Sequence, residues 1–175
     1  MISLKGQHLK LRALEPTDLD LLLAWENDTS QWHLSGTVAP YSRYILKRYL
    51  ENAHQDIYEA RQLRLIIETN TGKAIGTLDF FEFEPLHLRC GLGIFIADAN
   101  ARQKGFAFEA LQLACNFAFK AWGLQQLFAN ILENNTASQA LFKKLGFEKT
   151  GEKKAWVNIE GRFFNEGFYQ LMKED

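Results

Sequence analysis

The pattern of apolar and polar positions predicts strands and helices in a mixed order along this chain. Residues 9–14 (Leu-Lys-Leu-Arg-Ala-Leu) alternate at first, as in a half-buried strand. Short apolar runs predict three further strands at residues 63–67, 74–83 and 88–96, with turns at 70–73 and 85–87. Short turns between consecutive strands favour an antiparallel meander.

Four segments have the spacing of helices, at residues 15–27, 42–54, 105–122 and 135–145. Three last strands are predicted at residues 126–131, 148–157 and 162–171. Beyond the first turn, the helix at 105–122 has a single polar stripe, formed by Glu109, Gln112, Asn116 and Lys120. This helix is therefore expected to pack deep against a sheet. Together the elements predict an α/β (α+β) fold, with a mixed sheet of about seven strands and helices on both faces.

Composition and charge narrow the class of protein. The 175 residues fit one domain over 1–175, and a chain with 47% hydrophobic and 23% charged residues is globular in profile. A formal net charge of −1 disfavours nucleic acid and anionic membranes as partners. No run reaches the roughly 18 apolar residues of a membrane span. The first residues lack a signal-peptide core, so a cytoplasmic location is expected.

The two cysteines, Cys90 and Cys115, lie in apolar stretches without metal-ligand spacing. Because cysteine behaves as a small hydrophobe, both are expected to be buried free thiols. No metal site is expected from this sequence.

A basic segment with a glycine stands directly before the helix at 105–122. Between Asp98 and Glu109 it carries Arg102 and Lys104 and no acid, and Gly105 lets the backbone approach a ligand closely. The free N–H groups and the dipole at a helix start attract phosphate oxygens. The segment is therefore a candidate anion site, although an ordinary strand-to-helix turn with two solvated cations has the same composition.

Two motifs resemble the GNAT superfamily of N-acetyltransferases. Arg102-x-x-Gly105-x-Ala107 resembles its pyrophosphate-binding motif, and Asn135-x-x-Ser138 with the later Gly146-Phe147 resembles its second conserved segment. Residues 9–12, 16–19 and 161–164 resemble the ribosomal-protein and polyamine acetyltransferase branch. The resemblance implies the GNAT fold and acetyl-CoA as co-substrate. It also implies direct acetyl transfer, in a ternary complex, to a primary amine of a small molecule such as a polyamine or of a protein N-terminus.

The resemblance also implies where acetyl-CoA is held, in a cleft where the strands at 88–96 and 126–131 splay apart. The implied set is Phe95, Ile96, Ala97, Arg102, Gln103, Lys104, Gly105, Phe106, Ala107, Asn135, Ser138 and Phe142. The N–H groups from Gln103 to Ala107 would cradle the pyrophosphate, and the strand end at 95–97 would offer an N–H to the thioester oxygen. Asn135 is equally well placed to be a helix N-cap.

Two positions depart from the family pattern. Many relatives have a tyrosine four residues before the Gly-Phe pair, where this chain has Phe142, and relatives acting on protein N-termini often have a glutamate where it has Gly91. Phenylalanine has no proton to give to a departing thiolate. A non-catalytic acyl-CoA-binding or sensing module on the same fold is therefore the alternative function.

The remaining candidates for catalysis are Glu82, Glu84 and His87, around the turn after residue 83. Strand alternation places both glutamates on one face with Phe80, and places Asp79 on the other face with Phe81 and Phe83. Asp79, Trp32 and His33 are the candidates for contact with the acceptor amine. Each of these residues also has an ordinary role as a solvated surface or strand residue. The expected partners are acetyl-CoA and an amine; the oligomeric state stays open, with a homodimer as one option.

Overall fold

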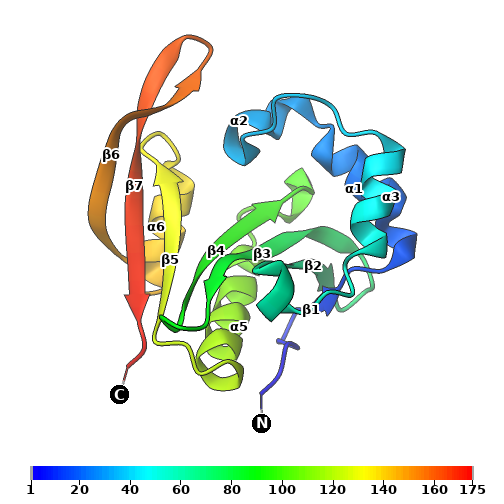
Figure 1. Cartoon of the computed structure of the whole chain (residues 1–175), viewed down its shortest axis with the longest axis horizontal. Coiled ribbons are helices and arrows are strands. Elements are labelled where there is room, and N and C mark those ends of the chain that lie inside the picture. Colours follow the sequence, from blue (N-terminus) through cyan, green and yellow to red (C-terminus); the bar gives the residue numbers. More distant parts are fainter. Residues whose placement is uncertain (1, 175) are drawn as a thin grey trace.

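One sheet runs through the molecule, and the two halves of the chain meet in it at β4 and β5 (Figure 1). The computed structural model describes residues 2–174. The strand order is β1-β2-β3-β4-β5-β7-β6. The strands are β1 (Leu9–Ala13), β2 (Leu63–Thr69), β3 (Ala74–Glu84), β4 (Arg89–Ile96), β5 (Gln126–Leu132), β6 (Glu148–Ile159) and β7 (Arg162–Met172). The predicted mixed sheet of seven strands is confirmed.

Neighbouring strands are antiparallel except at one place. Strands β2 to β4 form the predicted antiparallel meander, β1 pairs antiparallel with β2, and β7 pairs antiparallel with both β5 and β6. Only β4 and β5 are parallel. A parallel pair needs a crossover, and the helix α5 (Phe106–Ala121) supplies it.

Helix α5 forms one layer of the core. Its buried residues are Ala110, Leu111, Ala114, Cys115 and Ala118, and the polar stripe at 112, 116 and 120 is exposed, as predicted. The Glu109 carboxylate ties its first turn to the start of β1, because it accepts the backbone N–H and the Nδ1–H of His8, both at 2.9 Å. The later helix α6 (Thr136–Lys144) packs on the same core through Phe142.

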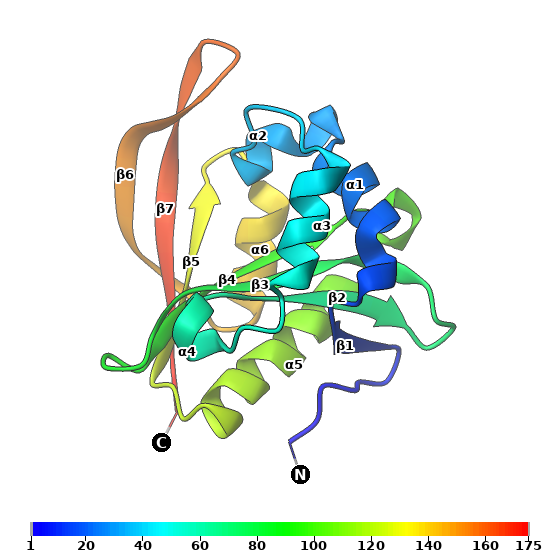
Figure 2. The ribbon, with the colours of Figure 1, turned by 45° about the vertical axis from the view of Figure 1, so that its right-hand side comes forward.

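The opposite face of the sheet carries the N-terminal helices (Figures 1 and 2). These are the short helix η1 (Pro16–Asp18), then α1 (Leu19–Glu26), η2 (Thr29–Gln31), α2 (Trp32–Ser35) and α3 (Arg43–Glu51). The chain continues through α4 (Ile57–Ala60) into β2, and η3 (Ala99–Ala101) follows β4. The sequence pattern misses α2 and α4, because a single helical turn is too short to show the helical period. No helix within residues 2–174 is long and apolar enough to cross a membrane.

The end of β3 departs from the predicted alternation. The pairing with β4 shifts between Phe81 and Glu84, and Glu82 has φ of +47°. This bulge turns Phe83 into the core beside Phe80, and both rings pack on Trp122 with centroid distances of 5.6 and 4.7 Å. The prediction that Phe83 shares a face with Phe81 is therefore wrong. An extra residue in one strand reverses the alternation beyond it.

Candidate functional site

The parallel strands β4 and β5 separate halfway along their length. Their pairing begins at Arg89 with Gln126 and ends at Gly91 with Phe128. Figure 1 shows the two strands diverging as a V beyond that point, with α2 on the side toward which they open. The second half of β4 therefore has unpaired backbone groups on the side of β5.

The direction of the N–H groups can be assigned at this opened edge. Ala97 donates its N–H to the carbonyl of Ile75 at 2.9 Å, on the β3 side. Hydrogen-bonding groups alternate in direction along a strand, so Phe95 also faces β3, while Ile96 faces the opening. The Arg102 side chain lies at the same edge, because its Nε donates to the Ile96 carbonyl at 3.1 Å. Of the three residues predicted here, Ile96 is the one whose N–H is directed toward the cleft.

The loop before α5 presents a row of free backbone donors. Gln103 and Gly105 have φ of +59° and +82°, so successive N–H groups turn toward one concave side. Gly105 is the N-cap residue and has no side chain to cap the helix, and the first helical bond runs from the Glu109 N–H to its carbonyl. From Gln103 to Ala107 no N–H has an acceptor within residues 2–174.

These features fit the pyrophosphate of coenzyme A. A Cβ added at Gly105 would meet nothing within 4 Å, so the helix start opens onto free space. The side chains of Arg102 and Lys104 are exposed beside it. An anion is stabilised by exactly such donors together with the positive end of a helix dipole. A diphosphate with an extended arm can therefore lie from this loop along the opened edge of β4.

Asn135 stands at the start of α6, three residues after β5 ends at Leu132. Its Oδ1 accepts the Ser138 N–H at 3.2 Å, which is the N-cap bond anticipated from the sequence. Its Nδ2 has no acceptor within residues 2–174 and is able to donate to a ligand. Phe142 is only 3% exposed and packs edge-to-face on Phe147 at 5.0 Å, so it acts as a core residue with no proton to donate.

A pocket of about 350 Å³ lies on the face of the sheet covered by α1 and α3. Its floor is a charged cluster in which Arg64 is held between two carboxylates. The guanidinium donates to both oxygens of Asp79, at 2.6 and 3.1 Å, and also to Glu26. Asp79 therefore lines the pocket but is paired with an arginine, and its contact with an acceptor stays a prediction.

Burial changes the ionisation of this cluster. Burial lowers the pKa of the Arg64 guanidinium, but the charge of Asp79, its hydrogen bond and the charge of Glu26 outweigh that effect, and the net shift is upward. Arg64 therefore stays charged at every accessible pH. Burial also raises the pKa of the Tyr49 hydroxyl in the wall of the pocket, so this phenol stays protonated.

The pocket reaches the opened strands through Phe81. Asp79 is the cross-strand partner of Gly93, and Phe81 that of Gly91. A side chain at Gly91 would collide with the Phe81 ring, whereas a Cβ at Gly93 would meet only that ring, at 3.8 Å. The Phe81 ring therefore fills the space where a side chain at Gly91 would lie. At Gly93, the missing side chain leaves more room between the pocket and the cleft.

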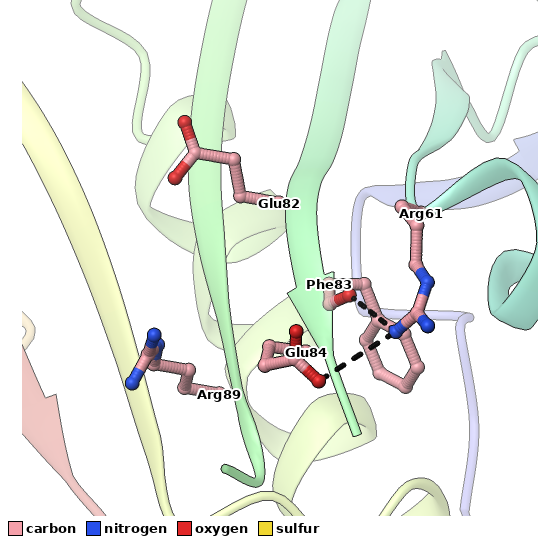
Figure 3. Close-up of a pocket in the computed structure, with 5 residues that line it drawn as sticks. All are labelled: Arg61, Glu82, Phe83, Glu84 and Arg89. Atoms are coloured by element: carbon pink, nitrogen blue, oxygen red, sulfur yellow. Dashed lines mark hydrogen bonds and ion pairs between the residues drawn. The ribbon is translucent and has the colours of Figure 1, made fainter. Parts of the chain in front are cut away.

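Two of the three predicted catalytic residues, Glu82 and Glu84, lie farther along β3 and line a second pocket of about 380 Å³ (Figure 3). Glu84 faces Arg61 at 3.7 Å and accepts the Leu86 N–H, while His87 is exposed in the turn. The Glu82 carboxylate is turned away from the Arg61–Glu84 pair. Glu82 has no ion-pair partner within residues 2–174 and stands next to Phe81, near the point where β4 and β5 separate.

Trp32 and His33 lie on α2, at the mouth of the V rather than in the pocket. The Trp32 ring is half-buried and donates its Nε1–H to the Glu26 carbonyl at 2.9 Å, which fixes α2 to the end of α1. His33 is exposed. Their contact with an acceptor stays a prediction.

Sequence reasoning missed Arg64 and its role as the centre of the pocket floor. The available signal was a single charged residue inside the apolar run Leu63-Arg64-Leu65-Ile66-Ile67. A charge at such a position is rarely buried unless it is paired. Its partners Glu26 and Asp79 are 38 and 15 residues away, so no local pattern could identify them.

Comparisons with known proteins agree with the geometry. A family model described as acetyltransferase (GNAT) domain matches residues 8–148. An uncharacterized N-acetyltransferase of Bacillus subtilis (strain 168) is 31% identical over 116 residues; the match covers 66% of this chain and 65%, less than two thirds, of that protein. Spermidine N(1)-acetyltransferase of Escherichia coli (strain K12) is 28% identical over 160 residues, which are 90% of this chain and 82% of that protein.

Among solved structures, the fold matches the crystal structure of spermidine N-acetyltransferase from Vibrio cholerae in complex with CoA and spermine. The TM-score is 0.83 at 24% sequence identity, and the match covers 94% of this chain and 95% of that one. The predicted GNAT fold is confirmed.

Proposed function

Because the chain belongs to the GNAT acetyltransferase family, we propose that it transfers an acetyl group from acetyl-CoA to a primary amine by direct attack in a ternary complex. Family membership makes the chain an acyltransferase with acetyl-CoA as its co-substrate. The acceptor is the amine of a small molecule or of a protein N-terminus. Relatives named spermidine N-acetyltransferase make polyamines the first acceptors to test.

One observation carries the proposal, namely the pairing of β4 with β5 that stops at Gly91 and Phe128 beside a loop of free N–H groups. The loop from Gln103 to Ala107 would hold the pyrophosphate, and the β4 edge at Ile96 would direct its N–H toward the thioester oxygen. Bound acetyl-CoA supplies the activated acetyl thioester. A positioned N–H that meets developing negative charge lowers a barrier by about 3 kcal/mol.

Proton transfer is assigned to Glu82. An amine attacks only in its neutral form, so a base or a water relay must take a proton from the ammonium. Glu84 is engaged by Arg61, and Asp79 by Arg64, whereas Glu82 is free of such a partner within residues 2–174. A positive φ at a non-glycine residue costs about 1–3 kcal/mol, and such strain is often retained at functional sites. The thiolate leaving group would be protonated by water, because Phe142 has no acidic proton.

The test has two stages. Isothermal calorimetry measures acetyl-CoA binding, and release of free coenzyme A thiol is then followed with a panel of primary amines. We expect binding and turnover on at least one amine. Binding without turnover on any amine would favour the non-catalytic sensing module, and a lack of binding would contradict the assignment of the cleft.

A further inference from the structure

The acceptor pocket has less negative charge than its acidic residues suggest. Its floor holds two carboxylates, Glu26 and Asp79, and one guanidinium, Arg64, which leaves one net negative charge. Asp79 is engaged through both oxygens by the Arg64 fork. A carboxylate bound in this bidentate way has few lone pairs left for further ammonium groups.

The acids around the first helix are neutralised in the same manner. Arg12 donates to both oxygens of Asp18, each at 2.9 Å, and Arg43 lies 2.6 Å from Asp20. With the pairing of Glu26, three of the five acids from residue 15 to 28 are matched by arginine, and Glu15 and Asp28 have no ion-pair partner within residues 2–174. These arginines interrupt the anionic surface above the pocket and weaken it as a binding site for a polycation.

The walls of the pocket are suited to the apolar part of a ligand. They are formed by the side chains of Tyr41, Ile45, Tyr49, Leu63 and Phe81. A cavity of about 350 Å³ is at the small end of the range for small-molecule sites. Apolar walls around a single fixed charge select a molecule with one polar end and an apolar remainder.

The position of the charge relative to the cleft is also fixed. Asp79 is the cross-strand partner of Gly93, which lies beyond the last β4–β5 pair and where an added Cβ would contact only the Phe81 ring, at 3.8 Å. Side chains of cross-strand partners are separated by about 5 Å. An ammonium group attracted by the one net negative charge of this cluster thus enters the cleft over Gly93, and the apolar part of the molecule lies against the pocket walls.

We propose that Arg64 is a specificity-determining residue, which restricts the acceptor to a small molecule with one amine and an apolar or aromatic body and disfavours polyamines. This inference rests on the proposed function, since it assigns the acceptor of the same site. It names a residue and a class of acceptor that the family resemblance does not supply.

The wild-type protein gives the first test through kcat/KM values for 2-phenylethylamine, spermidine and a short peptide with a free N-terminus. We expect 2-phenylethylamine to exceed the other two by about tenfold or more, which is the discrimination a well-matched pocket provides. A higher value for spermidine or for the peptide would overturn the inference while leaving acetyl transfer intact. No turnover on any amine would instead contradict the proposed function.

Two arginines allow a matched comparison, because Arg64 and Arg12 are both 25% exposed and each lies between two carboxylates. In Arg64→Gln both pocket carboxylates are freed, and we expect the ratio of kcat/KM for spermidine to that for 2-phenylethylamine to rise about tenfold. Arg12→Gln should leave this ratio unchanged. An equal change in both variants, or none in Arg64→Gln, would overturn the role of Arg64.

A second pocket variant, Glu26→Gln, tests the proposal if Arg64→Gln does not fold. Glu26→Gln retains Arg64 but removes the net negative charge of the pocket. We expect kcat/KM for 2-phenylethylamine to fall about tenfold, with KM rising more than kcat falls, because ammonium binding is weakened. Unchanged KM in a folded Glu26→Gln protein would show that this charge does not meet the acceptor. Thermal unfolding of each variant confirms that the protein is folded.

Discussion

The loop before α5 and the pocket under α3 are built from different parts of the polypeptide. The loop presents backbone N–H groups, and its geometry comes from two residues with positive φ, Gln103 and Gly105. The pocket presents side chains from α1, α3, β2 and β3, and its floor depends on the ion pairs of Arg64. A backbone site tolerates many side chains as long as its conformation is kept, whereas a pocket made of side chains changes with each substitution.

This difference explains why the two ends of the cleft carry different information about function. Every chain that binds the same co-substrate can use the same backbone donors, so a loop of this kind can indicate the co-substrate. Acceptors differ in charge and shape, and the side chains of an acceptor pocket must differ with them. If the proposed assignments hold, the paired acids of this pocket say more about the acceptor than the loop does.

The largest effect is expected at the loop. Gly105→Glu should weaken acetyl-CoA binding by about 10³-fold, because like charges brought together cost several kcal/mol. Gly72→Glu is the control, since Gly72 has φ of +83° in a hairpin turn, against +82° at Gly105, with equally open space. Calorimetry on both variants separates ligand repulsion from backbone strain. Equal affinity of the two variants would contradict a pyrophosphate site at this loop.

A smaller loss is expected at Glu82, the base proposed at the β3 bulge. Glu82→Gln should lower kcat/KM by about 10²-fold with little change in acetyl-CoA affinity, because loss of a general base costs at least this much. Glu84→Gln changes a neighbouring glutamate that is paired with Arg61, and should retain most of the activity. Equal losses in the two variants would point away from Glu82. A pH–rate profile that loses its acidic limb only in Glu82→Gln would support it.

The Arg12–Asp18 ion pair lies outside the pocket, so a substitution at Arg12 should affect stability. Arg12→Gln should lower the free energy of unfolding by about 2 kcal/mol at neutral pH, since it strands the buried Asp18 carboxylate; the value allows for partial exposure of Arg12. The hydrogen bond from Arg12 holds the pKa of Asp18 below its ordinary value of 3.8. The stabilisation is therefore complete above that pH and is lost as the pH falls through the folded-state pKa.

Urea unfolding of wild type and Arg12→Gln at several pH values measures the free energy that this ion pair contributes. The difference between the two proteins should be largest at neutral pH and should shrink in acid, as Asp18 becomes protonated in both. A difference that grew in acid would contradict the assigned ion pair.

The smallest effect concerns the two thiols behind the cleft. Burial raises the pKa of Cys90 and of Cys115 to about 12, and both are free and buried, as the sequence predicts. Thiolates are the reactive form, so the native protein should resist alkylation near neutral pH and react only after unfolding. Mass spectrometry after iodoacetamide treatment checks this. Rapid labelling of the native protein would show that the core opens at α5.

Local patterns were sufficient for the seven strands and the four longer helices, and they were sufficient to propose the anion loop. The apolar runs of β2 to β4 lie between turn residues, and Gly105 between a basic segment and an amphipathic helix marks the anion site. These features depend on neighbours within a few positions, where periodicity and glycine conformation act. Even the capping role of Asn135 follows from its place before a helix.

The pocket under α3 depends on contacts that no local pattern contains. Arg64 meets Glu26 and Asp79 only when α1, β2 and β3 are packed, and the bulge at Glu82 reverses the side-chain alternation predicted for Phe83. Ion pairing between distant residues and the register between strands are set by the packing of the whole chain. The amino-acid pattern was enough to identify the co-substrate, whereas only the three-dimensional packing brought Arg64 together with Glu26 and Asp79 and so set the charge of the pocket.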